Sequence, residues 1–318
     1  MSGAVSTRAC WVDCARTLAM FFIIWLHADA APWWVGKVVG GAIALFFLLA
    51  GYFLPVSAGQ VLRRTGRLAL AWLLWSLLSL GLMAVAAPDF EFSWQRSIGW
   101  GEAAYNTPLW FLKTLVVYQL VAAGLLALRV LPRFVRVAVP VLMLCSYTTA
   151  PAQYAAVRFD YFWIFLLGFA LKTLPLARIG DWVEENMPAL FLAGVICLSQ
   201  PYLLSLYAQW AELPWRHCSL PVGALGWALL MLLGGIACAR YLPHGAVALA
   251  FCGRWMLFIY AAHSFLLAPL YGGYNPHFLW NIWVPLLVLP LAVLLGRLLH
   301  RLAPRLMAVL QAKPFRMN

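Results

Sequence analysis

Charged residues are scarce in this chain of 318 residues, of which they make up 10%. Asp and Glu together number only 10, whereas hydrophobic residues amount to 65%. A typical soluble domain contains about 25% charged and about 45–50% apolar residues. The composition therefore excludes a soluble globular protein and requires lipid to cover the apolar surface.

The sequence also lacks the motifs by which many soluble enzymes and binding proteins are identified. It contains no Walker loop, dinucleotide-binding fingerprint, HExxH or GxSxG motif. Its seven cysteines form no CxxC pair and no metal-ligand spacing with histidine, so we expect no metal site. No stripe of Lys and Arg with interleaved aromatics follows a polar segment, so the net charge of +12 does not indicate nucleic-acid binding.

What the chain does contain is a series of apolar runs of about 20 residues, the length that a helix needs to cross a bilayer. Helices are favoured over a β-barrel because the runs are continuous and unpaired backbone groups are costly in hydrocarbon. We predict an all-α polytopic transmembrane helix bundle, with a single domain over residues 1–318 and a basic cytoplasmic tail at 301–318. About ten spans are expected, near residues 10–29, 38–57, 68–87, 109–128, 134–150, 159–175, 187–207, 219–240, 253–271 and 281–300.

The distribution of basic residues predicts the orientation of these spans. Most of the 22 Lys and Arg residues lie at alternate ends of the expected helices, as in the group Arg63, Arg64 and Arg67. Cytoplasmic loops of membrane proteins carry this excess of positive charge. We therefore expect both termini in the cytoplasm and an extracytoplasmic loop at about residues 88–108.

The first expected span carries three ionisable residues, Asp13, Arg16 and His27. Eleven residues separate Arg16 from His27, which turns a helix by about 20° more than three full turns over about 16 Å, so both side chains share one face. Asp13 lies three residues before Arg16 and could hold its guanidinium in an ion pair. Asp13 and Arg16 could equally anchor the helix at the membrane interface. His27 suits a proton acceptor in catalysis, although a membrane histidine can also serve as an interhelical hydrogen-bond partner.

A pair of arginines follows the second expected span. Arg64 and Arg67, three residues apart, project from the same side of a helix near its inner end. Forked guanidiniums are well suited to phosphoryl oxygens, so the pair could bind an anionic cytosolic cofactor. Ordinary anchoring at the cytoplasmic interface is the alternative explanation.

Further polar residues lie within or beside the expected spans, and each has a structural explanation. It could belong to the aromatic belt at the membrane interface, form an ion pair there, extend a charged end outward to water, or form a hydrogen bond with a neighbouring helix. Together they predict a polar cavity inside the bundle. These residues are Trp110, Lys113, Arg158 with Asp160, and Tyr260 with His263.

Several stretches, in this order, resemble the integral-membrane acyltransferase 3 family. The resemblance runs from Asp13 to about Leu270. It rests on Arg16 and His27 with ten residues between them after an acidic residue, on the stretch Leu45–Phe53 with Ala50 in place of the usual serine, on Arg64-x-x-Arg67, on Pro108–Leu112 and on Gly253–His263.

The resemblance implies an enzyme of the bacterial inner membrane that moves acyl groups, commonly acetyl, onto envelope carbohydrates. Acetyl-CoA would be the donor, with its phosphates held by Arg64 and Arg67 and its path lined by Arg16. His27, with Asp13 and Arg16, would carry the catalysis, either as a general base or by accepting the acetyl group itself. Because position 50 is alanine, no catalytic serine is expected there.

The expected partners are membrane lipid and a carbohydrate or glycolipid acceptor, for which Trp110, Tyr260 and His263 are the candidate binding residues. The sequence leaves the oligomeric state open. A secondary transporter of a small polar or anionic solute is the main alternative, since buried Arg and His also serve transport. The chain shows no inverted repeat that would favour it. A membrane scaffold without catalytic activity would leave the alignment of Arg16 and His27 unexplained.

Overall fold

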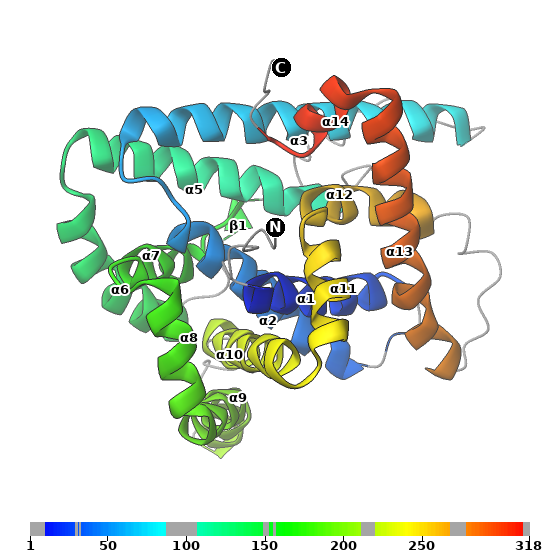
Figure 1. The fold of residues 1–318 in the computed structure, drawn as a ribbon. Coiled ribbons are helices and arrows are strands. Elements are labelled where there is room, and N and C mark those ends of the chain that lie inside the picture. The colour runs from blue at the N-terminus through cyan, green and yellow to red at the C-terminus, as the bar shows by residue number, and fades with distance from the viewer. Residues whose placement is uncertain are drawn as a thin grey trace, which may run out of the picture.

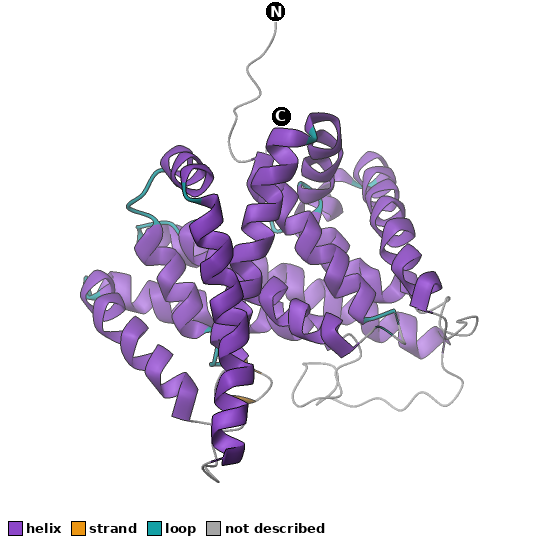
Figure 2. Cartoon of the chain, turned by 90° about the horizontal axis from the view of Figure 1, so that it is seen from below, coloured by secondary structure: helices purple, strands orange, loops and turns teal. Residues whose placement is uncertain are grey.

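A computed structural model describes residues 10–28, 31, 33–86, 107–148, 153–154, 157–210, 220–267 and 278–313. Over these residues the predicted all-α class is confirmed, apart from one short hairpin (Figure 2). The hairpin pairs the antiparallel strands β1 (Gln153–Tyr154) and β2 (Val157–Arg158). The helices are α1 (Cys10–Leu26), α2 (Trp33–Tyr52), α3 (Ala58–Ala86), the 3₁₀ helix η1 (Thr107–Leu109), α5 (Trp110–Ala127), α6 (Leu131–Thr148), α7 (Phe162–Leu171), α8 (Leu176–Glu185), α9 (Met187–Trp210), α10 (Leu220–Tyr241), α11 (Pro243–Gly253), α12 (Met256–Leu267), α13 (Phe278–Leu302) and α14 (Pro304–Leu310).

A helix overlaps each of the expected spans, but the predicted count of ten is not confirmed. Among the described residues, 5 helices are long and apolar enough to cross a membrane, or up to 7 if each bent pair is one span. The bent pairs are α7 with α8, at 99°, and α11 with α12, at 79°. The orientation of the termini remains a prediction, and most of the expected loop at 88–108 lies outside the described residues.

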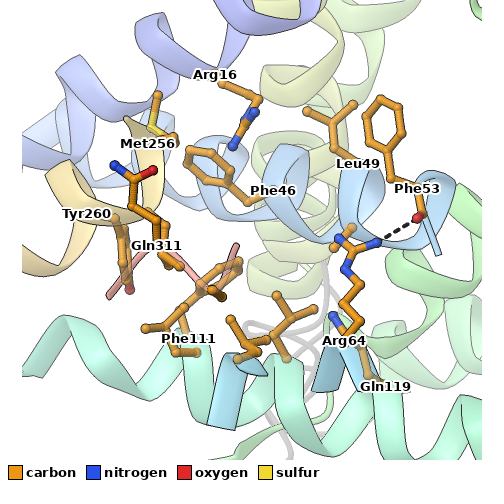
Figure 3. Close-up of a pocket in the computed structure, with 16 residues that line it drawn as sticks. Arg16, Phe46, Leu49, Phe53, Arg64, Phe111, Gln119, Met256, Tyr260 and Gln311 are labelled. Carbon is orange, nitrogen blue, oxygen red and sulfur yellow. Dashed lines mark hydrogen bonds between the residues drawn. The ribbon is translucent and has the colours of Figure 1, made fainter. Parts of the chain in front are cut away.

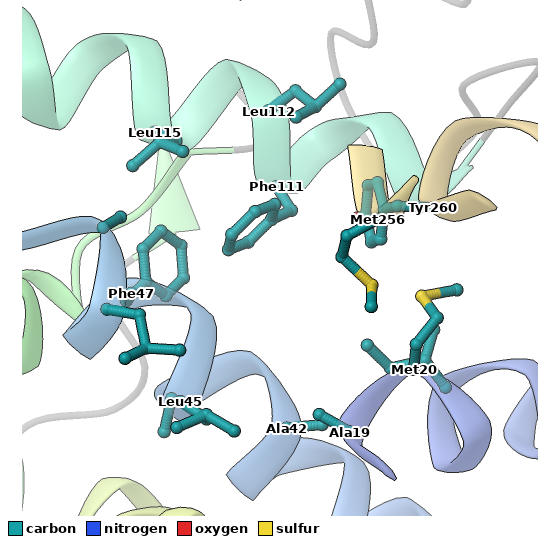
Figure 4. Packing of buried hydrophobic residues seen from close by; sticks show 14 of the residues in the cluster. Ala19, Met20, Ala42, Leu45, Phe47, Phe111, Leu112, Leu115, Met256 and Tyr260 are labelled. Atoms are coloured by element: carbon teal, nitrogen blue, oxygen red, sulfur yellow. The ribbon is translucent and has the colours of Figure 1, made fainter. Parts of the chain in front are cut away.

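The first helix lies inside the bundle, where α1 packs against α2, α10, α11, α12 and α13 (Figure 1). Small side chains allow this close packing, since Ala15 and Ala19 are fully buried. Figure 4 shows Ala19 of α1 beside Ala42 of α2, with Met20 of α1 extending toward Met256 of α12 within the apolar core. The helix that carries the main candidate residues is therefore enclosed by protein.

The outer helices present apolar side chains to the surroundings. Leu73 and Leu77 of α3 and Leu287 and Leu294 of α13 are all exposed. Only 28% of the apolar window of α3 is buried, against 61% for that of α2. Exposed leucines on long apolar helices are what a lipid-facing surface requires.

Two glycines allow α2 and α7 to cross in direct backbone contact. A Cβ atom on Gly51 would lie 1.9 Å from the carbonyl oxygen of Phe165, and one on Gly168 would lie 2.0 Å from that of Leu48. Neither position has room for a side chain. Helix packing thus explains why the stretch Leu45–Phe53 has glycine at position 51, since small residues allow membrane helices to cross closely.

Within the segment expected to be a basic cytoplasmic tail, Pro304–Leu310 form α14, which packs onto the bundle. Met307 and Leu310 are buried, and the indole Nε1 of Trp75 in α3 donates to the carbonyl of Leu310 at 3.2 Å. α14 ends in a Schellman motif, in which Lys313 N donates to Ala308 O at 2.9 Å and Ala312 N to Val309 O at 2.8 Å. These contacts fix the residues just after α14 against the core.

Candidate active site

A cavity of about 310 Å³ lies where α1, α2, α3, α5, α12 and the end of the chain meet (Figure 3). Most of its wall is aromatic and aliphatic, with Phe46, Phe53 and Phe111 among the larger side chains. Arg16 and Arg64 bring positive charge to it. An apolar cavity with a few polar groups is the usual form of a small-molecule site.

Arg16 reaches the cavity from α1 and is held by Asp13. Its Nη1 lies 3.1 Å from the Asp13 Oδ1, so the predicted ion pair forms. Asp13 in turn packs against the break between α11 and α12, because a Cβ on Gly253 would lie only 2.7 Å from the Asp13 Cβ. The pair is therefore anchored to two parts of the bundle, and the guanidinium of Arg16 is oriented toward the cavity.

Arg64 lines the cavity from α3. This helix begins ten residues before the expected span, so Arg64 and Arg67 both lie within it. The Nη1 of Arg64 donates to the carbonyl of Phe53 at 2.6 Å (Figure 3). The positive charges of Arg16 and Arg67 repel that of Arg64, and Arg64 in turn repels Lys172. The Nζ of Lys172 donates a hydrogen bond to the carbonyl oxygen of Leu54. Of these four cations, Arg16 and Arg64 line the cavity, whereas Arg67 and Lys172 do not.

His27 follows the last residue of α1, where its backbone N donates to Ile23 O at 3.2 Å. Its ring lies 5.3 Å from the ring of the fully buried His263, measured between centroids. The Nδ1 of His263 lies 2.6 Å from the carbonyl of Tyr260, so Nδ1 carries the hydrogen and donates it. Tyr260 itself lines the cavity. The two histidines therefore adjoin the cavity through Tyr260, although neither is part of its lining.

The remaining candidate residues form a separate group at the start of α5. Arg158 makes a two-point contact with Asp160, at 3.0 and 2.5 Å, which confirms the interface pair expected as their structural explanation. The guanidinium of Arg158 also lies over the rings of Trp110, at 5.8 Å, and Tyr161, at 5.4 Å. Trp110 does not line the cavity, whereas its neighbour Phe111 does. The structure thus places Trp110 with the Arg158 group rather than with Tyr260 and His263.

Two polar residues of the cavity wall were missed by the sequence analysis, namely Gln119 of α5 and Gln311 after α14. Gln119 had a signal, because an amide in the middle of an apolar span is costly unless it is used. Gln311 had none, since only the folding of the C-terminal segment brings it to the wall. Ala50, which stands where the family usually has serine, also lines the cavity.

Within the part of the chain that the structure describes, no group of three or more His, Cys, Asp or Glu side chains could hold a metal ion.

Comparison with known proteins gives one result. A family model of the acyltransferase domain that defines the acyltransferase 3 family matches residues 11–301. Neither a search of curated proteins nor a search of solved structures finds a significant match. The matched region contains the cationic cavity wall of α1 to α3, the two histidines and the long apolar helices of a multi-pass membrane protein. The chain therefore belongs to the acyltransferase 3 family and is a membrane acyltransferase.

Proposed function

We propose that the protein transfers an acetyl or similar short acyl group from cytosolic acyl-CoA to a hydroxyl group of an envelope carbohydrate, in the bacterial inner membrane. The acceptor would be a cell-surface polysaccharide or its lipid-linked precursor. The observation that carries this proposal is the convergence of Arg16 and Arg64 on an apolar cavity beside the pair His27 and His263. One end of the site is thus suited to a polyanion and the other to proton transfer.

The cationic end is suited to the phosphates of CoA. Arg64 and Arg67 lie about one helical turn apart on α3, and Arg16 of α1 lines the same cavity as Arg64. Guanidiniums bind phosphoryl oxygens through charge-assisted, often paired hydrogen bonds. The mutual repulsion of these cations would be relieved by a bound anion, which gives the site a reason to prefer a polyanionic donor.

The proposed chemistry centres on His27. In the direct route His27 takes the proton of the acceptor hydroxyl, whose oxygen attacks the thioester carbonyl. The C–S bond breaks, CoA leaves as a thiolate, and the proton on His27 passes to that sulfur. In the two-step route the unprotonated imidazole nitrogen attacks the thioester carbonyl, the C–S bond breaks, and CoA leaves as the thiol with the ring proton. The acyl group then passes from the imidazole to the acceptor oxygen, and the hydroxyl proton returns to the imidazole.

The acceptor is proposed to bind beside the histidines. Tyr260 and His263 are the stronger candidates, because their rings lie 5.9 Å apart and the ring of His263 lies 5.3 Å from that of His27. Trp110 is the weaker one, since the guanidinium of Arg158 already lies over its ring. Aromatic faces pack well against the apolar faces of sugar rings.

The test is transfer of label by the purified protein. The protein in lipid vesicles is incubated with radiolabelled acetyl-CoA and envelope glycolipid, and the label is followed. Label in an ester of the glycolipid supports the proposal, and label on His27 supports the two-step route. Uptake of an anionic solute into the vesicles without any acyl transfer would instead support the transporter alternative and contradict the proposal.

A further inference from the structure

Two buried amides in the cavity wall have unused hydrogen-bond donors. The side chain of Gln119 is 0% exposed and that of Gln311 is 8% exposed. The Nε2 atoms of both are buried and have no hydrogen-bond partner among the described residues. Folded proteins pair nearly all such groups. Two unpaired amide donors on one cavity therefore point to a ligand that accepts hydrogen bonds from them.

The amide of Gln119 is held so that Nε2 is its free end. Its Oε1 lies 3.1 Å from the hydroxyl of Thr65, which shares its single hydrogen between that oxygen and the carbonyl oxygen of Val61 at 2.8 Å. Thr65 directly follows Arg64 on α3, and Figure 3 shows Gln119 close to Arg64. The donor of Gln119 thus lies near the cationic end of the cavity.

The amide of Gln311 lies at the other end. Figure 3 shows it beside Met256 and Tyr260, across the cavity from Arg64. Its backbone N donates to Met307 O at 3.1 Å, and the Schellman motif after it fixes Ala312 at φ 50. A non-glycine residue in this left-handed conformation is sterically strained. The C-terminal segment is therefore held in a specific conformation that places Gln311 and Ala312 in the wall.

The chemistry of the wall narrows the choice of ligand. A sugar ring offers several hydroxyl groups that need both donors and acceptors, and a mostly apolar wall would leave many of them unpaired at a cost. The pantetheine arm of CoA is uncharged, carries a branched apolar carbon, and offers two amide carbonyls along an extended chain. The volume of about 310 Å³ is at the low end of the range of about 300–1,000 Å³ for small-molecule sites, which suits an arm rather than a whole nucleotide.

We infer that Gln119 and Gln311 bind the pantetheine arm of the acyl donor, each donating a hydrogen bond from Nε2 to one of its amide carbonyls. This inference rests on the proposed function, which supplies acyl-CoA as the donor. It assigns binding roles to two residues outside the Arg and His motifs. It also makes the C-terminal segment part of the donor site.

The experiment uses the full chain in lipid nanodiscs, with the variants Gln119→Leu, Gln311→Leu and Gln311→Met. Gln60→Leu, at an exposed position of α3, is the matched control. Binding is measured for acetyl-CoA, for S-acetylpantetheine and for adenosine 3′,5′-bisphosphate as the nucleotide half. Thermal unfolding is measured without ligand.

We expect each cavity variant to bind acetyl-CoA and S-acetylpantetheine about 2- to 12-fold more weakly, the value of one neutral hydrogen bond. Binding of the nucleotide half should not change. The melting temperature without ligand should stay the same or rise, because an unpaired buried amide has been replaced by an apolar group. A merely structural role would give the opposite result, a lower melting temperature with unchanged affinity.

Two outcomes separate the inference from the proposed function. Wild-type protein that binds neither acetyl-CoA nor S-acetylpantetheine would overturn the proposed donor and, with it, the inference. Wild-type protein that binds both, alongside folded Gln119 and Gln311 variants with wild-type affinity, would overturn the inference alone. Equal loss of affinity for the nucleotide half would also overturn it, because that half carries neither amide carbonyl.

Discussion

Replacing His27 by alanine tests the proposed chemistry most directly. His27 is half-buried in the turn after α1, so its removal leaves the enclosed part of the helix intact. A lost general base lowers the rate on the order of 10²–10⁴-fold, which corresponds to a barrier higher by about 3–5 kcal/mol. Binding of acetyl-CoA should be preserved, because the cationic end of the cavity is unchanged.

The neighbouring histidine provides the comparison. When His27 holds the proton of the acceptor, a second proton on His263 at 5.3 Å would cost roughly 3 kcal/mol at an effective dielectric constant of about 20. His263 therefore supports catalysis best as a neutral neighbour that donates Nδ1–H to Tyr260. His263→Asn should lose less than about 12-fold, the value of a neutral hydrogen bond.

The assay is single-turnover transfer of labelled acetyl in nanodiscs, with acetyl-CoA binding measured on the same samples. A folded His27→Ala protein that retains more than about a tenth of wild-type transfer falls outside the range for a lost general base. A larger loss in His263→Asn than in His27→Ala would assign the base to His263 instead. Either result would refute the role proposed for His27.

Three further predictions concern the donor site, the topology and the helix packing. The double variant Arg64→Ala and Arg67→Ala should weaken acetyl-CoA binding by about 100-fold or more, since each charge-assisted hydrogen bond is worth about 1.5–3 kcal/mol. Lysine at both positions should restore binding only in part, and unchanged binding in the alanine variant would leave both arginines with a role in membrane orientation alone. A cysteine reporter within residues 88–108 should be labelled from outside intact cells, and one fused after the last residue should not; the reverse pattern would contradict cytoplasmic termini and the cytosolic donor. Gly51→Ala should abolish stable folding, because its Cβ would lie 1.9 Å from a carbonyl oxygen, whereas Gly81→Ala on α3, with nothing within 4 Å, should be tolerated or slightly stabilising in thermal unfolding.

The helices could be predicted because their apolar runs match the thickness of a bilayer. The ion pair of Asp13 with Arg16 could be predicted too, because residues three apart on a helix are neighbours. These features depend on short stretches of sequence. They were therefore accessible from residue spacing alone.

The features that depend on tertiary contacts were not accessible. The break between α11 and α12 falls at Arg254 and Trp255, and beside it Gly253 closely approaches Asp13, a residue far away in the chain. The distance between His27 and His263 follows from the packing of α1 against α12. Trp110 was proposed for acceptor binding because aromatic faces pack against sugar rings, and its contact with Arg158 likewise depends on the fold.

The position of Gln311 in the cavity wall has a consequence for the order in which the protein is made. Arg16 belongs to α1, whereas Gln311 and Ala312 follow α14 and are synthesised much later. The cavity is therefore completed only after residue 312 has left the ribosome and α14 has docked onto α3. A nascent chain that stops within α13 carries both histidines and all the arginines of the cavity, yet it lacks one wall of the site. Assembly of the cavity thus requires that every helix from α1 to α14 has been synthesised.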